Sequence, residues 1–262
     1  MLFGQASFLI YLFHKSIKNT EMTRFRLFLL TAIIVAAPSI ANAQAFSKDD
    51  RVGAEQTFVT TEAAGWVSDR TTYRIVGKEE SAARTTLILS QKSSIKADKD
   101  STPIETTLTV KILYTPNSIV IPKENFSSSL GMVEEMFPDK KIEMSFSGDD
   151  PSMPNSLSVG QKLPDSEVKA TITVEGINAK MSIKGTDRRI TARERVTVPA
   201  GSFDAFVLEE SATVKVTVLI LSQSEKTTEK SWIVPGMGEV KAITYDKKGK
   251  LSSTTEMTSY TK

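Results

Sequence analysis

The sequence predicts a mainly β fold, in which a strongly curved antiparallel sheet or half-barrel carries one short helix. Three observations support this class. Runs rich in threonine, valine and isoleucine alternate between apolar and polar residues with a period of two, which is typical of half-buried strands. Short turn-forming sequences separate these runs, and no segment has the spacing of a strand-helix-strand unit. Consecutive hairpins curled into one sheet are therefore the expected architecture.

The first element along the chain is a secretory signal peptide. After Met22, residues 23–26 are positively charged, residues 27–37 are apolar, and Ala41-Asn42-Ala43 forms a small-x-small cleavage site. The apolar run is shorter than the roughly 20 residues that span a bilayer as a helix, which favours cleavage over anchoring. We therefore expect cleavage after Ala43 and a periplasmic or secreted protein, with residues 44–262 forming a single β-rich domain.

Residues 1–21 precede this complete signal and contain a second apolar stretch. The simplest interpretation is a misassigned upstream start, with Met22 as the true start, so that residues 1–43 are leader. A long N-terminal region of the signal peptide is the alternative. No cysteine follows the cleavage site, so we expect no lipid anchor at the mature N-terminus.

The composition excludes several kinds of chemistry. The chain has no cysteine and one histidine, His14, which lies in the predicted leader. The mature protein would lack thiolate nucleophiles, cysteine-based metal sites and the usual general base of hydrolases. Loss of the leader removes four basic residues and one acidic residue, which leaves a net charge of −1. We therefore expect no enzyme, catalytic residue, metal, cofactor or nucleic-acid partner, and no integral membrane segment after cleavage.

The strand-like runs fill most of the mature sequence. We count about eleven of them. They cover residues 56–61, 71–76, 84–90, 105–114, 141–147, 167–175, 179–184, 188–198, 203–223 and 227–234, and finally 239–245 with 251–260.

Three turn sequences predict how some of these runs are joined. Pro199-Ala200-Gly201 fits a type I turn followed by a glycine bulge, and Asp246-Lys247-Lys248-Gly249 fits a four-residue turn. Glu175-Gly176-Ile177-Asn178 is the third. We expect the first turn to join residues 188–198 to the run that starts at Phe203, and the second to join the last two runs.

One segment has helical periodicity instead of alternation. Apolar side chains recur at helical spacing in residues 125–137, and a proline follows. We expect a short amphipathic helix that plugs the core of the sheet, or alternatively a movable lid over a ligand. The methionine- and phenylalanine-rich middle of the chain fits a lipid-sized cavity and ordinary core filling equally well. The candidate ligand-lining residues in this segment are Phe126, Leu130, Met136 and Phe137.

Two further candidates for the lining lie nearer the C-terminus, Glu194 and Trp232. Glu194 shares a predicted strand face with Ile190, Ala192 and Val196, where an inward carboxylate needs a partner or a water-filled cavity. The alternative is a bulge or strand end that turns Glu194 to solvent.

The remaining acidic residues carry weaker signals. Asp149-Asp150 beside Asn155 offers oxygen ligands for calcium, but no calcium-binding loop sequence is present, so a solvated acidic turn is favoured. Glu209-Glu210 and Glu134-Glu135 are adjacent pairs, and spacing alone does not place two carboxylates across a cleft as a glycosidase requires.

The C-terminal half contains two motifs, V-P-A-G-x-F at residues 198–203 and W-x-x-P-G-x-G-x-V-K at residues 232–241. This pair resembles the TapB-like family of exported β-rich proteins of unknown function. The resemblance implies no catalytic residues. By a further analogy of fold, it implies a distant relationship to periplasmic lipoprotein carriers of the LolA and LolB kind, in which an incomplete barrel wraps apolar cargo. The motif residues are turn formers and packed anchors: Pro199, Gly201, Phe203, Trp232, Pro235, Gly236 and Gly238.

We expect the concave sheet to bind or carry an apolar ligand, such as a lipid or an acylated protein partner. The alternative is a non-enzymatic structural or interaction module of the cell envelope, which binds another protein through a sheet edge. A hydrolase that uses only carboxylates is a third class, and it would require two acidic side chains converging in a cleft.

Overall fold

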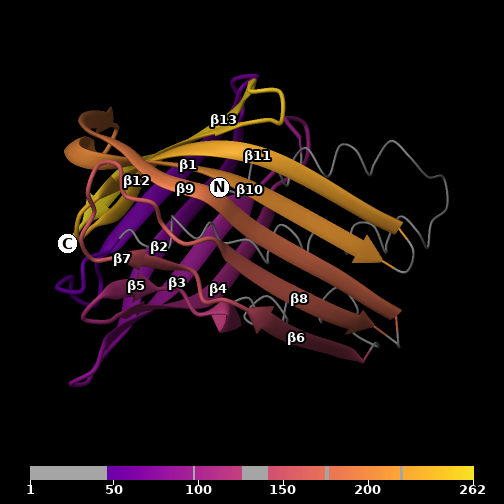
Figure 1. Cartoon of the computed structure of the whole chain (residues 1–262), viewed down its shortest axis with the longest axis horizontal. Coiled ribbons are helices and arrows are strands. Elements are labelled where there is room, and N and C mark those ends of the chain that lie inside the picture. The colour runs from indigo at the N-terminus through magenta and orange to yellow at the C-terminus, as the bar shows by residue number, and fades with distance from the viewer. Residues whose placement is uncertain (1–45, 97, 126–140, 175–176, 219–220) are drawn as a thin grey trace.

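The computed structural model describes residues 46–262, except residues 97, 126–140, 175–176 and 219–220. They form one antiparallel sheet of 13 strands in the order β6-β8-β9-β10-β11-β12-β13-β1-β2-β3-β4-β5-β7 (Figure 1). The sheet is strongly curved and does not close, which confirms the predicted fold class. The strands are β1 (Glu55–Glu62), β2 (Val67–Glu80), β3 (Thr85–Ile95), β4 (Ile104–Tyr114), β5 (Ser118–Val120), β6 (Ile142–Gly148), β7 (Ser152–Pro154), β8 (Ser166–Val174), β9 (Ile177–Val198), β10 (Gly201–Val218), β11 (Leu221–Val234), β12 (Gly238–Tyr245) and β13 (Leu251–Thr261).

Two of the three predicted turns lie within the described residues, and both are confirmed. Pro199-Ala200-Gly201 joins β9 to β10, and the turn ending at Gly249 joins β12 to β13. Gly201 and Gly249 have φ angles of 140° and 75°, which glycine adopts without the strain that a side chain would cause. The third turn includes residues 175–176, which lie outside the described residues.

Two predicted strand assignments are wrong. The runs 179–184 and 188–198 form one strand, β9, of 22 residues. The run 203–223 is divided between β10, which ends at Val218, and β11, which begins at Leu221. Gly185-Thr186-Asp187 has the composition of a turn although β9 continues through it, and the residues between β10 and β11, Leu219 and Ile220, are apolar and give no turn signal. The three-residue strands β5 and β7 were not predicted because three residues are too few to show a period of two.

The predicted helix lies outside the described residues from residue 126 onward, and so do Phe126, Leu130, Met136 and Phe137. In the part of the chain that the structure describes, no helix is both long and apolar enough to cross a membrane.

The sheet brings together segments that are distant in sequence. β1 pairs with β13, and Figure 1 shows the indigo and yellow strands side by side. The two outermost strands, β6 and β7, are consecutive in the chain, and only residues 149–151 connect them. The two edges of the sheet therefore approach each other at this link. Gly148 ends β6 here with a φ of 93°, where an added Cβ would lie 2.1 Å from the Glu167 carbonyl oxygen.

A line of bulges crosses the long strands. The register between β9 and β10 shifts at Val207/Leu208, and the register between β11 and β12 shifts at Trp232/Ile233. Because Val207 pairs with Trp232, the two irregularities are adjacent. Bulges increase local twist and bend a sheet. Figure 1 shows β6 and β8 to β11 extending together away from β1 to β5.

Two clusters of core residues lie on opposite faces at the bulge line. The larger cluster packs the buried side chains of β1 to β5 against Val207 and Trp232. The smaller cluster contains their sequence neighbours Leu208 and Ile233. Since successive residues of a strand point to opposite faces, both faces of the sheet are packed at this line.

Candidate functional site

Beyond the bulge line, four neighbouring strands present a continuous apolar surface. The register pairs Phe146 of β6 with Ala170 of β8, Ala170 with Met181 of β9, and Met181 with Val216 of β10. Paired residues share a face of the sheet, so these side chains form one row across it. The residues of β8, β9 and β10 on this face are buried. We name the surface the apolar wall: Met144, Phe146, Val168, Ala170, Ile172, Ala179, Met181, Ile183, Ala212, Val214, Val216 and Val218.

The opposite face of the same strands is polar. Lys169, Lys180 and Lys215 alternate with the wall residues and are exposed. The wall residues belong to neither of the two core clusters formed by the described residues.

Strand β11 places acidic side chains beside this wall. Glu225 pairs with Val214, and Glu229 lies four residues further along the same face. Glu239 of β12 pairs with Ile233, at the end of that face. We name four residues the acidic stripe: Glu210, Glu225, Glu229 and Glu239.

One guanidinium compensates part of the negative charge of the stripe. Arg188 Nε donates to Glu210 Oε2 at 2.9 Å, and its Nη1 donates to the Pro164 carbonyl at 3.0 Å. The two side chains of the ion pair are 4% and 9% exposed. Burial raises the pKa of Glu210, and the charge of Arg188 opposes that rise. This ion pair is thus excluded from water and held by a backbone contact.

The other carboxylates of the stripe are less well compensated. Glu229 accepts hydrogen bonds from the Ser231 hydroxyl at 2.7 Å and from the Thr244 hydroxyl at 3.3 Å. Glu239 is fully buried, and neither of its carboxylate oxygens has a hydrogen-bond partner among the described residues. Burial, reinforced by the charge of Glu229, raises the pKa of Glu239 to about 8. Burial also raises the pKa of Glu225 to about 7. Glu225 and Glu239 therefore take up protons near neutral pH.

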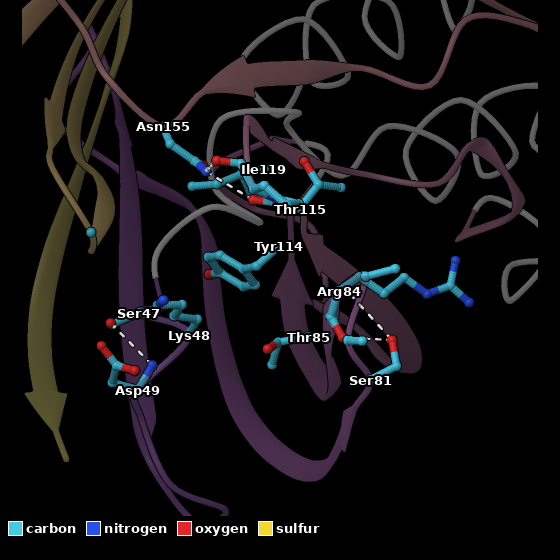
Figure 2. A pocket seen from close by; sticks show the side chains of 14 residues that line it. Ser47, Lys48, Asp49, Ser81, Arg84, Thr85, Tyr114, Thr115, Ile119 and Asn155 are labelled. Carbon is cyan, nitrogen blue, oxygen red and sulfur yellow. Dashed lines mark hydrogen bonds between the residues drawn. The ribbon is translucent and has the colours of Figure 1, made fainter.

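A pocket of about 470 Å³ lies where the β2–β3, β4–β5 and β11–β12 turns meet (Figure 2). Much of the polar surface of this pocket is already hydrogen-bonded within local turns. The Ser81 hydroxyl donates to the Arg84 carbonyl, and Asn155 donates to the carbonyls of Thr115 and Pro116. Figure 2 shows the Arg84 side chain pointing away from the other labelled side chains. We therefore place the candidate site at the apolar wall and the acidic stripe.

Glu194 and Trp232 contact each other away from the wall. The Trp232 indole Nε1 donates to Glu194 Oε1 at 2.7 Å, and Lys230 Nζ lies 4.8 Å from the centroid of the Trp232 ring. Glu194 is 45% exposed. Of the two alternatives for Glu194, this exposure favours the solvent-facing position. Trp232 is 7% exposed and packs in the larger core cluster.

We expect Trp232→Ala to lower the free energy of unfolding by about 3–5 kcal/mol, because truncating a buried tryptophan leaves a cavity. Urea denaturation followed by far-ultraviolet circular dichroism measures this loss. Val52→Ala is the control, because Val52 is 56% exposed, and we expect it to change stability by less than about 0.5 kcal/mol. If the Trp232→Ala protein were as stable as the Val52→Ala protein, the packing of Trp232 would not contribute to stability at the bulge line.

The other motif residues lie at the two turns. Pro199 and Gly201 belong to the β9–β10 connection, and Phe203 packs against the larger core cluster. Gly236 and Gly238 have φ angles of 74° and 98°. Together with Pro235, they shape the β11–β12 turn.

The acidic turn before β7 makes structural contacts. Asp150 Oδ1 accepts hydrogen bonds from the backbone amide and the ammonium group of Lys123, both at 3.0 Å. Asp149 accepts from the Glu167 amide at 3.0 Å. Among the described residues, no group of three or more histidine, cysteine or acidic side chains is arranged to hold a metal ion.

Sequence reasoning missed the acidic stripe and Arg188. Within the T-E-K-S-W sequence of β11, Glu229 resembles an ordinary solvated residue. Its burial follows from the register of β11 on β10. The sequence analysis did not separate these two strands, so it could not give their register. The signal that could have revealed it is the alternation of the strand. Alternate residues share a face, so Glu229 lies on the same face as Thr227, Ser231 and the apolar Ile233.

Solved structures with this fold come from exported proteins and lipoproteins. One, from Bacteroides fragilis, is described as an exported protein with a YmcC-like fold; it has 16% identity and a TM-score of 0.60, with 83% of this chain and 100% of that chain covered. Another, described as a lipoprotein from Parabacteroides distasonis, has 16% identity and a TM-score of 0.57, with 82% of this chain and 97% of that chain covered. At this identity the likeness concerns the fold alone.

Sequence comparison adds the family. No curated protein matches the chain. The resemblance to TapB-like proteins and the relationship to LolA and LolB carriers stay predictions. The sequence matches the DUF3108-like family over residues 51–257, and the chain belongs to that family.

Proposed function

We propose that this protein is exported to the periplasm or secreted, and that it binds or carries an apolar ligand along the apolar wall. The ligand is a lipid or the acyl chain of a modified partner, and the role is non-enzymatic. The observation that carries the proposal is the wall itself, rows of paired apolar side chains that continue across β6, β8, β9 and β10.

The side chains of the wall suit an alkyl chain. They are mainly valine, alanine, isoleucine and methionine, without a hydrogen-bonding group along the rows that run from β8 to β10. Burying an alkyl chain on such a surface contributes roughly 0.8 kcal/mol for each methylene group. Methionine in two of the rows adapts to apolar partners of different shape.

The leader and the fold support export. A complete signal peptide ends at Ala43. Phe46, three residues after the predicted cleavage site, is buried in the larger core cluster. The solved structures of similar fold are described as exported proteins or lipoproteins.

A second candidate function is protein binding through the edge strand β6. β6 pairs with β8 on one side, and it ends the strand order of the sheet on the other. None of its seven residues is fully buried. A strand edge with this exposure can accept a strand from another protein. This function predicts a partner protein that adds a strand to β6, while the apolar wall holds no ligand.

The test of the ligand-binding proposal is a titration of delipidated protein with hexadecanol, delivered from cyclodextrin and followed by calorimetry. Ala170→Trp fills the middle of the wall, so we expect it to weaken binding at least tenfold. Lys169→Trp is the matched control, because the neighbouring side chain lies on the exposed face, and we expect wild-type affinity. Equal affinity in the two variants, with native circular dichroism spectra for both, would exclude the wall as the binding surface.

A further inference from the structure

The two edge strands of the sheet differ in how well they are protected from pairing. β7 has three residues and ends at Pro154, and Pro151 precedes it. Short edge strands and prolines prevent a further strand from pairing. β6 has seven residues and no proline, and among the described residues no backbone hydrogen bond reaches its free edge. Figure 1 shows β6 at the lower margin of the molecule. β6 is therefore the edge that can accept another strand.

The apolar side chains of β6 are only partly covered. Ile142, Met144 and Phe146 lie on the same face as the wall and are half-buried. Their neighbours on β8, Ala170 and Ile172, are both 4% exposed. The wall thus ends at β6 with apolar side chains that one further strand would cover.

The sequence around β6 is complementary to itself in the antiparallel direction. When two copies pair with a two-fold axis at Ser145, Lys141 of one copy lies opposite Asp149 of the other. The axis generates this ion pair twice, once at each end of the paired strands. The remaining pairs also match in character, and they are Glu143 with Ser147, Met144 with Phe146, and Ile142 with Gly148.

The two charged groups are available for such a pair. Lys141 Nζ lies 2.7 Å from Glu143 Oε1, but the two side chains are 83% and 63% exposed, so water surrounds this contact. Asp149 is exposed, and its Oδ2 accepts a hydrogen bond from the Glu167 amide at 3.0 Å. This bond leaves Oδ1 of Asp149 for a cation from a second copy.

Other registers match less well. A shift of one residue places apolar side chains opposite polar ones. An axis at Glu143 brings two carboxylates together, and an axis at Phe146 places Glu143 opposite Asp149. An axis at Met144 places a serine opposite the lysine and forms no ion pair. The axis at Ser145 therefore combines matched faces with opposite charges.

We propose that β6 pairs with β6 of a second copy of this chain, antiparallel and with the two-fold axis at Ser145. This inference rests on the second candidate function, for which it names the partner, and it does not depend on a ligand of the wall. The row that contains Ala170 and Phe146 continues into Met144 and Ile172 of the second copy. A single strand pair is a small interface, and interfaces below roughly 1,200 Å² are typical of transient complexes. We therefore expect a dimer that dissociates on dilution.

Single cysteines test the position of the axis. The chain has no cysteine, so each variant carries one thiol. Ser145→Cys places two thiols directly opposite each other, and a thiol-specific cross-linker that spans about 5 Å matches the Cβ separation of such residues. Ser147→Cys is the matched control on the same face of β6, because its two thiols would lie about 13 Å apart along the strands. We expect most of the Ser145→Cys protein to form a covalent dimer on a denaturing gel, and the Ser147→Cys protein to stay monomeric.

Charge variants test the ion pairs by sedimentation velocity. The protein is expressed with its predicted leader, purified without detergent and examined over a range of concentrations, and the wild type should change from monomer to dimer as the concentration rises. Lys141→Glu places two carboxylates opposite each other at both ends of the strand pair, so we expect association to weaken about tenfold. Lys180→Glu is the control, because it makes the same change in net charge at an exposed residue of β9, and we expect wild-type association.

The outcomes separate this inference from the proposed functions. A wild-type protein that stays monomeric at every concentration would overturn the self-pairing, and the second candidate function would then require a different protein as partner. Equal cross-linking of Ser145→Cys and Ser147→Cys, or a dimer that Lys141→Glu does not weaken, would also overturn it. The hexadecanol titration tests the apolar wall separately, because its two variants lie on β8.

Discussion

Replacing Arg188 by alanine is expected to lower the free energy of unfolding by about 3–5 kcal/mol, because it leaves the Glu210 carboxylate buried without its partner. Both side chains of this pair are almost completely enclosed. Arg188 also donates to the Pro164 carbonyl, so the segment before β8 loses a contact with β9. Urea denaturation at neutral pH measures the loss.

Two variants test whether the loss of the ion pair causes the loss of stability. Arg189→Ala changes the next residue, which is exposed, and we expect it to cost less than about 0.5 kcal/mol. The double variant Arg188→Met, Glu210→Leu removes both charges, and we expect it to recover most of the lost stability. If Arg188→Ala were as mild as Arg189→Ala, the pair would not be buried as the structure describes.

The second large effect is a pH dependence of stability that originates at Glu239. Burial and the charge of Glu229 raise the pKa of this carboxyl group from its ordinary 4.5 to about 8 in the folded protein. Between these two pH values the folded state binds more protons than the unfolded state. Stability is therefore lost as the pH rises from 4.5 to 8, by about 1.4 kcal/mol for each pH unit from this group.

The variant Glu239→Gln isolates this contribution. It should match the wild-type protein near pH 4.5 and become progressively more stable than the wild type up to pH 8, in chemical denaturation at a series of pH values. Other buried carboxyl groups titrate as well: burial raises the pKa of Asp69 to about 7, and burial also raises the pKa of Glu210. Glu256→Gln is the control, and we expect its stability to follow the same pH profile as that of the wild type. Parallel pH profiles for the wild type and Glu239→Gln would show that Glu239 is ionised without cost in the fold.

The sequence predicts most of the strands because alternation is a local property. In β4 and β13, buried residues alternate with more exposed residues over most of the length, and the predicted ranges match the observed strands closely. The Pro199-Ala200-Gly201 turn is equally local, since its residues determine its backbone angles. Such elements require no knowledge of the rest of the chain.

The candidate site could not be predicted in the same way. The apolar wall depends on the register of β9 and β10, and two register shifts alter that register at Val207/Leu208 and Glu209/Ser211. A bulge changes which residues share a face, so the face of one end of a strand cannot be found by extending the alternation from its other end. Glu239 is inward because of a similar shift beside Ile233. Its complete burial follows from the packing of the whole sheet, which no local pattern contains.

The central claim is that the apolar wall holds an apolar ligand, and native mass spectrometry tests it most directly. The protein is expressed with its predicted leader, purified without detergent and weighed intact, and any bound molecule is extracted into organic solvent and identified. We expect a discrete lipid mass on the wild-type protein and on Lys169→Trp, and none on Ala170→Trp. A folded wild-type protein that carries no ligand in repeated preparations would contradict the claim and favour protein binding through the edge strand β6.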